Sequence, residues 1–397
     1  MKVLQVNCVY GKGSTGKIMQ DIHRELLARG HESVVCYGRG TKAAEDQVYK
    51  VCPEWYAKAN NLLSRFTGLM YGGCFFSTNK LISIIKKEKP DVVHLHCING
   101  YFVNIYRLIT WLKNRHVKTV LTLHAEFMHT ANCGHALDCE KWKTGCEGCR
   151  RWKKETKSLF LNRTAASWQK MKKAFDGFEQ DCLITSVSPW LMERAKSAPI
   201  LEKFRHVTVM NGLDTEVFCP QDGTEVREKL QIGDRKMVLH VTAGFSLDPD
   251  HLKGGYYVAE LAKLLPEMAF VVVGSRDPHM ELPENVINVG RLESQKELAA
   301  YYSAADVTLL TSKRETFSMV TAESLCCGTS VVGFKAGAPE GIALPEYSGF
   351  AEQGDLEHLR QLVLLHSERP ADHISAHQTY GKRQMVDGYL GCYEEKL

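Results

Sequence analysis

Two glutamates eight residues apart, Glu315 and Glu323, flank the stretch RETFSMVTAE. The residues between them have the apolar spacing of a helix face, and at the helical rise the two carboxylates would be separated by about 12 Å. The intervening amides of Thr316, Phe317 and Ser318 would then lie at a helix N-terminus, where free N–H groups and the helix dipole stabilise a diphosphate. Two glutamates at this spacing are also common as surface charges, so the pair alone leaves both interpretations open.

A glycine-rich turn, GKGSTGKI, follows the first apolar run of the chain. It is similar to the nucleotide-phosphate loop G-x-x-x-x-G-K-[ST], but Ile18 stands where that loop needs a hydroxyl for Mg²⁺. One interpretation is a strand-to-helix turn with Ser14 or Thr15 as the N-cap. The interpretation that fits better is a turn in which Gly13 lets the backbone approach a bound anion or sugar.

Four cysteines are grouped in the segment TANCGHALDCEKWKTGCEGC. Cys133, Cys139, Cys146 and Cys149 have the spacing C-x5-C-x6-C-x2-C in a loop without apolar periodicity. This spacing predicts a tetrahedral zinc site with a structural role. Two disulfides or four unbound thiols are the alternatives for the loop 133–149.

Short apolar runs that predict strands alternate with stretches of helical periodicity. The predicted strands are 3–7, 33–38, 91–96, 118–124 and 182–188, then 206–214, 237–242, 269–274, 286–290, 306–311 and 329–334. Between them there is room for crossover helices, and Ile18, Ile22 and Leu26 form the apolar stripe of one that Gly30 should end. We therefore expect an α/β protein in which two Rossmann-like domains face each other across a cleft.

The predicted domain bounds follow from where the strand pattern restarts. An N-terminal domain covers 1–205 and a C-terminal domain covers 206–375. The last segment, 376–397, is predicted to be a helix that crosses back to the first domain.

Further motifs accompany the glutamate pair: VMNGLDTEVFCP at 209–220, HLKGG at 251–255, VVVG at 271–274, and VGRLESQKELAAYYSAADVTLLTSKRETF at 289–317. With them, the chain resembles the large family 4 of retaining, nucleotide-sugar-dependent glycosyltransferases with the GT-B fold. The resemblance covers nearly the whole chain and is strongest over 206–345. It implies that Glu315 and Glu323 contact the donor sugar and ribose, and that Lys253 contacts the donor diphosphate.

The resemblance also implies roles for residues of the first domain. Gly13, Ser14 and Thr15 would lie near the transferred sugar and phosphate, and His124, at the end of the TLH strand, near the reaction centre. A structural histidine at a strand end is the alternative for His124.

Other implications concern the chemistry and a departure from the family pattern. The implied reaction needs no catalytic metal and retains the anomeric configuration of the sugar. The family usually has an Arg before its Lys-Gly, whereas HVTAGFSLDPDHLKGG has none. Arg276 is a candidate substitute for that second cation. We expect His94 and His96 to be structural, with a place for one of them in the lining of the cleft as the alternative.

Charge is unevenly distributed between the halves of the chain. Residues 1–200 carry 31 Lys and Arg against 17 Asp and Glu, a surplus of +14, whereas the whole chain carries only +4. Two stretches in this half, 55–76 and 150–175, also interleave aromatic residues with cations. This combination favours peripheral contact with an anionic membrane. A solvated lysine-rich surface, a covered core and nucleic-acid binding are the alternatives.

The resemblance implies an enzyme that transfers a sugar from a nucleotide-diphosphate sugar to a hydroxyl of a saccharide, and the expected membrane contact favours a lipid-linked acceptor. The cysteine-rich segment also resembles that of members that build capsular, O-antigen or exopolysaccharide units. Because no apolar signal core begins the sequence, we expect a cytoplasmic protein at the inner face of the cell membrane. A nucleotide-sugar epimerase and a non-catalytic nucleic-acid-binding protein are the other hypotheses, and nucleic acid is not the expected partner.

Overall fold

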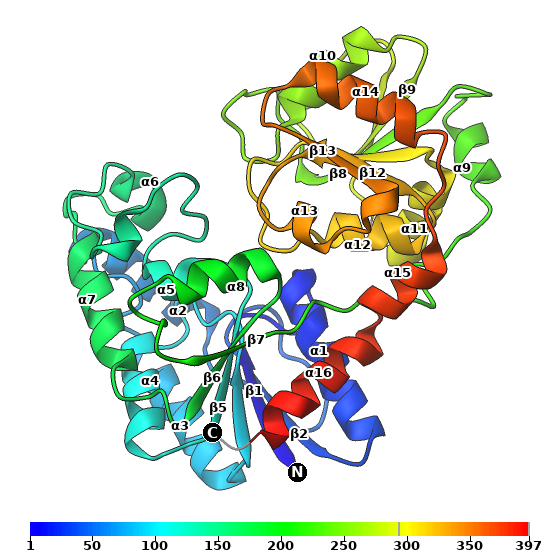
Figure 1. Ribbon diagram of the computed structural model, residues 1–397. Coiled ribbons are helices and arrows are strands. Elements are labelled where there is room, and N and C mark those ends of the chain that lie inside the picture. The colour runs from blue at the N-terminus through cyan, green and yellow to red at the C-terminus, as the bar shows by residue number, and fades with distance from the viewer. Residues whose placement is uncertain (293, 396–397) are drawn as a thin grey trace. The chain divides into compact units, whose positions relative to one another are not determined.

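The computed structural model describes residues 1–292 and 294–395. Glu293, inside the motif at 289–317, and the last two residues of the predicted C-terminal helix lie outside the described residues. The chain divides into two compact units, unit 1 with Met1–Met210 and Met385–Leu397, and unit 2 with Asn211–Gln384 (Figure 1). Both are α/β units built on a parallel sheet.

The sheet of unit 1 has the strand order β3-β2-β1-β4-β5-β6-β7. Its strands are β1 (Lys2–Asn7), β2 (Glu32–Tyr37), β3 (Val48–Lys50), β4 (Val92–Leu95), β5 (Thr119–Leu123), β6 (Cys182–Ser186) and β7 (Arg205–Thr208). The helices are α1 (Gly13–Ala28), α2 (Glu54–Thr67), α3 (Phe75–Glu88), α4 (Ile105–Asn114), α5 (Phe127–Thr130), α6 (Trp152–Thr156), α7 (Thr164–Phe175), α8 (Pro189–Lys196) and the C-terminal α16 (Lys382–Glu394).

Helix α1 confirms the helical pattern predicted after the glycine-rich turn. Ile18, Ile22 and Leu26 are buried in one core cluster with Val3 of β1, and the helix ends at Ala28. The same cluster contains side chains of α16, namely Met385, Val386, Tyr389, Cys392 and Tyr393. Helix α16 is therefore part of the core of unit 1.

The sheet of unit 2 has the strand order β10-β9-β8-β11-β12-β13. Its strands are β8 (Met237–Gly244), β9 (Ala269–Ser275), β10 (Val286–Gly290), β11 (Val307–Leu310), β12 (Ser330–Phe334) and β13 (Ser348–Ala351). The helices are α9 (Thr224–Lys229), α10 (Gly255–Leu264), α11 (Gln295–Ala304), α12 (Met319–Cys326), α13 (Pro339–Ile342), α14 (Leu356–His366) and α15 (His373–Tyr380). Apolar residues of the strands and of α10 and α14 form its core.

The strand predicted at 206–214 belongs to the first sheet, not to the second. It is β7, which pairs with β6, so the predicted bound at 205 falls inside a strand of unit 1. The sequence of an edge strand does not specify which sheet it joins, because that depends on a partner distant in sequence.

The segment predicted as one helix from 376 forms the end of α15 and then α16. The two helices separate at Gly381, whose neighbours pair with Leu213: Leu213 N donates to Tyr380 O at 2.8 Å, and Lys382 N donates to Leu213 O at 2.9 Å. These bonds replace helical ones and end α15. Among the described residues, no helix has the length and apolar character needed to cross a membrane.

Candidate functional site

The strand order of each sheet creates one point where the chain changes direction across the sheet. In unit 2 this switch point lies between β8 and β11, and in unit 1 between β1 and β4. Ligands of open parallel sheets bind beyond the carboxyl ends of strands at such points. The segments that follow β8 and β11 contain Lys253 and Glu315, and the segment that follows β1 contains Gly13.

Lys253 and Glu315 come together in unit 2. The Nζ of Lys253 lies 2.6 Å from Oε1 of Glu315. The Lys253 side chain is 35% exposed and the Glu315 side chain is 16% exposed. The backbone of Lys253 is fixed by Thr311, whose Oγ1 donates to the Lys253 carbonyl at 3.1 Å. The next residue, Gly254, has φ +64°, and a Cβ there would lie 2.1 Å from the Thr311 carbonyl oxygen. Only glycine fits this close approach before α10 begins.

Glu315 lies before helix α12, not on it. Its N–H donates to Ala336 O at 2.9 Å and its carbonyl accepts from Ala338 N at 3.2 Å, so the segment after β12 holds it. The helix begins at Met319, after Ser318, which has φ +82° and whose Oγ accepts from Thr321 N. The prediction that both glutamates lie along one helix is therefore wrong, because the chain turns at Ser318.

The second glutamate, Glu323, lies within α12. Its Oε2 accepts a hydrogen bond of 2.9 Å from the hydroxyl of Tyr302. Burial raises the pKa of Tyr302, and the negative charge of Glu323 raises it further. The Tyr302 hydroxyl therefore stays protonated and orients the carboxylate.

The three residues before α12 are largely buried. Thr316, Phe317 and Ser318 have exposures of 9%, 3% and 6%, respectively. They directly precede the first turn of the helix, so their backbone lies at its N-terminus. Arg276, the candidate second cation, donates from Nη1 to the carbonyls of Asp277, Pro278 and Met280, so it is held within its own loop.

In unit 1 the glycine-rich turn leads directly into α1. The N-cap is Lys12, without a side-chain cap bond, and Gly13 is the first helical residue. The alternative interpretation with Ser14 or Thr15 as N-cap is wrong, because the helix starts earlier and places both in its first turn. Gly13 has φ +63° and nothing lies within 4 Å of a Cβ built there, so the space beside it is open. Asn7, at the end of β1, donates to Thr15 Oγ1 at 3.4 Å.

His124 follows the last residue of β5 and contacts a second histidine. Its Nε2 lies 3.1 Å from Nδ1 of His96, whose Nε2 lies 3.3 Å from Oε1 of Gln5. Burial lowers the pKa of His124 to about 4 and lowers that of His96. His124 is therefore a neutral imidazole near pH 7.

The contact between His96 and His124 was not predicted, although alternation along DVVHLH places His94 and His96 on one face of the predicted strand 91–96. His94 Nδ1 lies 2.7 Å from the hydroxyl of Tyr393 in α16, and its Nε2 lies 2.7 Å from Thr122 Oγ1. These partners agree with the structural role expected for His94.

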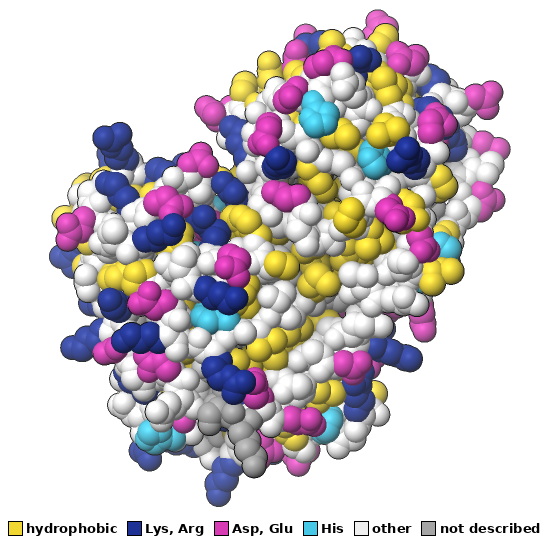
Figure 2. Space-filling view, viewed as in Figure 1, with side chains coloured by type: hydrophobic (Ala, Val, Ile, Leu, Met, Phe, Trp, Pro, Cys, Tyr) yellow, Lys and Arg dark blue, Asp and Glu magenta, His cyan; other side chains and the backbone are white. Residues whose placement is uncertain are grey.

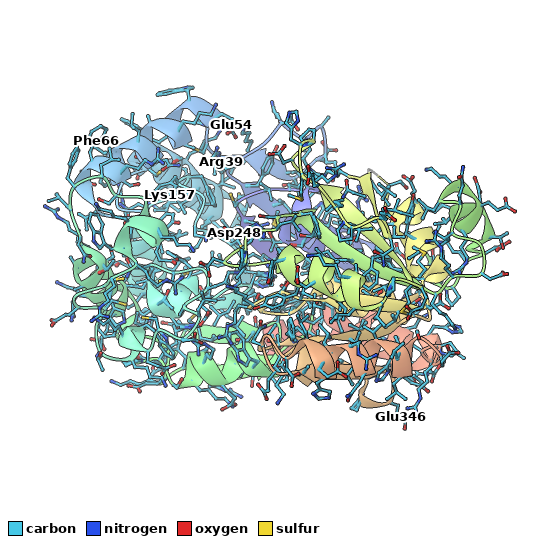
Figure 3. All side chains as sticks on the ribbon, turned by 90° about the horizontal axis from the view of Figure 1, so that it is seen from above. Arg39, Glu54, Phe66, Lys157, Asp248 and Glu346 are labelled. Atoms are coloured by element: carbon cyan, nitrogen blue, oxygen red, sulfur yellow. The ribbon has the colours of Figure 1, made fainter. Side chains whose placement is uncertain are left out.

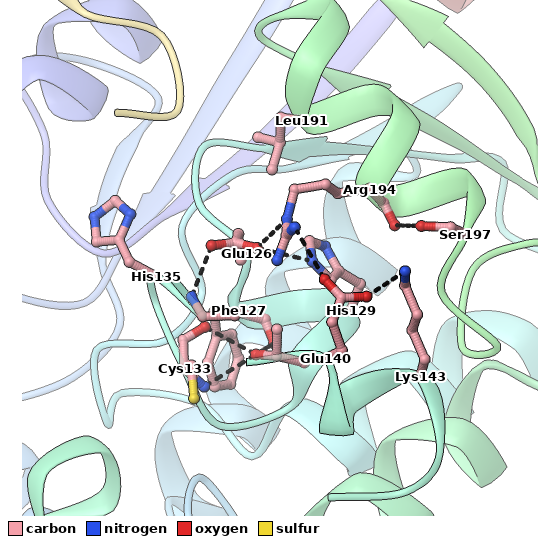
Figure 4. A network of polar contacts seen from close by, with 12 residues as sticks. Glu126, Phe127, His129, Cys133, His135, Glu140, Lys143, Leu191, Arg194 and Ser197 are labelled. Carbon is pink, nitrogen blue, oxygen red and sulfur yellow. Dashed lines mark hydrogen bonds and ion pairs between the residues drawn. The ribbon is translucent and has the colours of Figure 1, made fainter. Parts of the chain in front are cut away.

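A buried ionic network that the sequence analysis missed lies two residues beyond His124 (Figure 4). Glu126 is fully buried, accepts from Ala136 N at 2.7 Å, and lies 2.5 Å from Nε of Arg194 in α8. Burial acts to raise the pKa of Glu126, but His129 and Arg194 outweigh it and hold this pKa below its ordinary value. The network therefore ties the segment after β5 to the cysteine-rich loop and to α8.

The four cysteines of the loop 133–149 are free thiols, of which Cys133 and Cys146 are buried. Burial raises the pKa of Cys146 to about 12. Over residues 1–292 and 294–395, no three His, Cys, Asp or Glu side chains form a group that could hold a metal ion. The structure thus supplies no support for the predicted zinc site, which stays a prediction.

Two family models match the chain. Residues 15–217 match Glycosyltransferase Family 4, and residues 246–364 match Glycosyl transferases group 1. A similar curated protein is the "Putative colanic acid biosynthesis glycosyl transferase WcaC" of Escherichia coli K12, 24% identical, with 99% of this chain and all of that protein covered. Another is N-acetyl-alpha-D-glucosaminyl L-malate synthase of Bacillus anthracis, 23% identical, with 99% and 93% covered.

Solved structures of glycosyltransferases share the fold. Sucrose-phosphate synthase of Thermosynechococcus elongatus superposes with a TM-score of 0.66 at 15% identity, covering 99% of this chain and 98% of that one. Anabaena Alr3699/HepE, solved in complex with UDP, gives a TM-score of 0.63 at 16% identity, with 99% of each chain covered. With its two parallel-sheet units, the protein has the GT-B fold. Since a family model matches more than half of its residues, the chain belongs to glycosyltransferase family 4.

Proposed function

We propose that the protein is a retaining glycosyltransferase. In this proposal it moves a sugar from a nucleotide-diphosphate sugar to a hydroxyl of a lipid-linked saccharide during the synthesis of a surface polysaccharide. The ion pair between Lys253 and Glu315, beyond the switch point of unit 2, is the observation that carries the proposal. Support comes from the Escherichia coli relative named for colanic acid biosynthesis and from the HepE complexes with UDP and UDP-glucose.

In the proposed complex, unit 2 binds the donor. Lys253 contacts the diphosphate, and Glu315 accepts hydrogen bonds from the sugar hydroxyls. The amides of Thr316, Phe317 and Ser318 face the phosphates from the start of α12, where the helix dipole favours negative charge. Glu323, oriented by the Tyr302 hydroxyl, accepts from the ribose.

The chemistry requires stabilisation of a leaving diphosphate. Cleavage of the anomeric bond builds negative charge on the leaving oxygen, and a preorganised Lys and a helix N-terminus stabilise that charge without reorganising. The acceptor hydroxyl attacks the anomeric carbon from the face that the diphosphate leaves and passes its proton to the departing phosphate oxygen. The anomeric configuration is therefore retained. In this proposal no catalytic metal takes part.

Unit 1 contributes the acceptor side of the reaction. Gly13, Ser14 and Thr15 lie near the transferred sugar, where a residue with a side chain in place of Gly13 would fill the open space beside the turn. His124, neutral near pH 7, orients a sugar or acceptor hydroxyl. The proposed location is the cytoplasmic face of the cell membrane, where lipid-linked acceptors are found.

The experiment that tests this function has two stages. First, a panel of nucleotide sugars is screened by thermal shift, because a donor that binds the folded chain raises its melting temperature. The stabilising donor is then incubated with lipid-linked saccharides extracted from membranes, and transferred sugar is separated from isomerised donor. Transfer supports the proposal. Isomerised donor without transfer, or a salt-dependent shift of DNA or RNA without any donor consumption, would overturn it.

A further inference from the structure

Helix α2 of unit 1 has its apolar side facing solvent. Its buried residues are Ala57 and Ser64, both small. Its large apolar side chains Trp55, Leu62, Leu63 and Phe66 are exposed, Trp55 by 70%. A helix that packs on a core normally buries its largest apolar residues. The sequence of α2 is thus amphipathic, but the core receives only its small residues.

Two neighbouring segments extend this exposed apolar surface. Phe76, at the start of α3, is 77% exposed and its ring lies 5.9 Å from that of Tyr56. Phe160 is 70% exposed and its ring lies 6.1 Å from that of Phe66. We call the whole set the apolar face; it consists of Trp55, Leu62, Leu63, Phe66, Phe75, Phe76, Leu159, Phe160 and Leu161.

The backbone holds these segments together, so the apolar face is part of the fold. Leu159 N donates to Arg65 O at 2.8 Å. Gly68, directly after α2, has φ +70°, and a Cβ there would lie 2.6 Å from the carbonyl oxygen of Leu161. A glycine is therefore needed for this close contact.

Two of the segments that form the apolar face also carry exposed cations. Lys58 and Arg65 are exposed on α2 itself, and Lys157 is exposed on the segment that carries Phe160. Phe66 and Lys157 are labelled on these two segments in Figure 3. On the other side of unit 1, which Figure 2 draws, Lys and Arg side chains are numerous, with Asp and Glu side chains among them.

A basic groove adjoins the apolar face. It lies between α4 and α7, has a volume of about 1030 Å³, and is lined by Arg107, Trp111, Lys113, Arg115, Lys170 and Lys173 among others. None of the described residues that line it is acidic. Arg107 joins the two features, because its guanidinium lies 5.9 Å from the ring of Phe75.

We propose that unit 1 binds an anionic lipid bilayer through the apolar face, with a phosphate headgroup in the basic groove. Apolar and aromatic side chains that alternate with Lys and Arg match the boundary between acyl chains and anionic headgroups. A second copy of the chain is a poor match, since a symmetric pair would place the same cations opposite one another. In the proposed function, this surface would hold the enzyme at the membrane that contains its lipid-linked acceptor. The inference rests on the proposed function only for this purpose, because vesicle binding is measured without donor or acceptor.

The test is co-sedimentation of the full chain with vesicles of phosphatidylcholine, alone or mixed with phosphatidylglycerol. We expect binding to the mixed vesicles that weakens as salt is raised. The triple variant Leu62→Gln/Phe66→Gln/Phe160→Gln should reduce the bound fraction to about a tenth, as expected when apolar contact with the acyl boundary is lost. The variant Arg107→Gln/Lys170→Gln/Lys173→Gln should lose the preference for phosphatidylglycerol.

Matched controls come from exposed residues elsewhere. Leu27→Gln/Leu264→Gln replaces leucines that are 48% and 49% exposed, and should bind like the wild type. Circular dichroism of every variant verifies the fold. Several results would overturn the proposal: no vesicle binding by the wild type, unchanged binding by the apolar variant, or a dimer that the apolar variant converts to a monomer. Stabilisation by inorganic phosphate without vesicle binding would also overturn it, and would assign the groove to free phosphate.

Discussion

The ammonium of Lys253 lies 2.6 Å from a carboxylate oxygen of Glu315, although the two residues are 62 positions apart. One follows β8 and the other follows β11, the two strands on either side of the switch point. The pair is only partly exposed, so each charge holds the other in position. In the proposed complex, the donor diphosphate would replace the Glu315 carboxylate beside Lys253, and sugar hydroxyls would replace the Lys253 ammonium beside Glu315.

Removal of either charge should stop sugar transfer while the fold persists. We expect Lys253→Ala and Glu315→Ala each to lower kcat/KM for transfer by about 100-fold to 1000-fold, as when one preorganised donor to a developing charge is lost. Steady-state kinetics and the melting temperature measure the two effects. Lys263→Ala, in an exposed pair with Glu260 on the same helix, is the control. Near-normal turnover of either variant would remove that residue from the site.

Gly13 should be sensitive to substitution and Lys17 insensitive. Gly13→Val requires a β-branched residue to adopt φ +63° and fills the open space beside the turn. We expect it to abolish transfer, while the donor still raises the melting temperature through unit 2. Lys17→Ala should stay active. In a triphosphatase this Lys would contact the β- and γ-phosphates, so hydrolysis of ATP or GTP that vanishes in Lys17→Ala would contradict the account.

The buried carboxylate of Glu126 should make Arg194 important for stability. Arg194→Met leaves Glu126 buried without its main ion-pair partner, which typically costs about 3–5 kcal/mol of the free energy of unfolding. Urea denaturation measures this change. Arg24→Met is the matched control, because Arg24 pairs with Glu45 at an exposed site and should cost at most about 1 kcal/mol. Equal losses for both variants would show that the network in Figure 4 adds nothing beyond a surface pair.

The stability of the protein should fall as the pH is lowered through the range in which His124 titrates. Burial places the pKa of His124 at about 4 in the folded chain, below the ordinary value of 6.5, so the unfolded chain binds protons first. The contribution of neutral His124 to the free energy of unfolding is therefore complete above pH 6.5 and is lost progressively as the pH falls toward 4. The melting temperature of His124→Gln should therefore depend less on pH in this range. A variant with the slope of the wild type would contradict the assigned pKa.

Chelation separates the two predictions about metals. Sugar transfer should survive titration with EDTA, because in the proposed reaction Lys253 and backbone amides hold the diphosphate. Metal analysis by inductively coupled plasma is predicted to find about one zinc ion per chain, reduced in Cys149→Ser. A strict requirement for Mg²⁺ or Mn²⁺ would count against the proposed chemistry. Protein without zinc would contradict the predicted zinc site, and the four cysteines of the loop would then be free thiols.

Local patterns in the sequence predicted a large part of the fold. The apolar stripe of α1 and the mainly apolar runs of β1, β5 and β9 were sufficient, because a strand buried between helices needs apolar residues on both faces. Lys253 and Glu315 were each suggested by a motif within one short segment. The family resemblance assigned both residues to one donor site, and the chain topology brings their side chains into contact.

Other features depend on contacts between distant segments and could not be predicted locally. The turn at Ser318 depends on the pairing of Glu315 with the segment after β12. The contact of His96 with His124 requires β4 and β5 to be neighbours in the sheet. The sequence of α2 left open whether its apolar side meets a membrane or covers a core, since periodicity identifies an apolar face but not the side on which the core lies.

The most direct test of the central claim follows the anomeric proton of the transferred sugar by NMR. The wild type and Glu315→Ala are compared with the donor that raises the melting temperature most and with the lipid-linked acceptor. We predict a product signal with the anomeric configuration of the donor, formed in step with the release of nucleoside diphosphate and lost in Glu315→Ala. An inverted product, or a product formed equally fast by Glu315→Ala, would contradict the account.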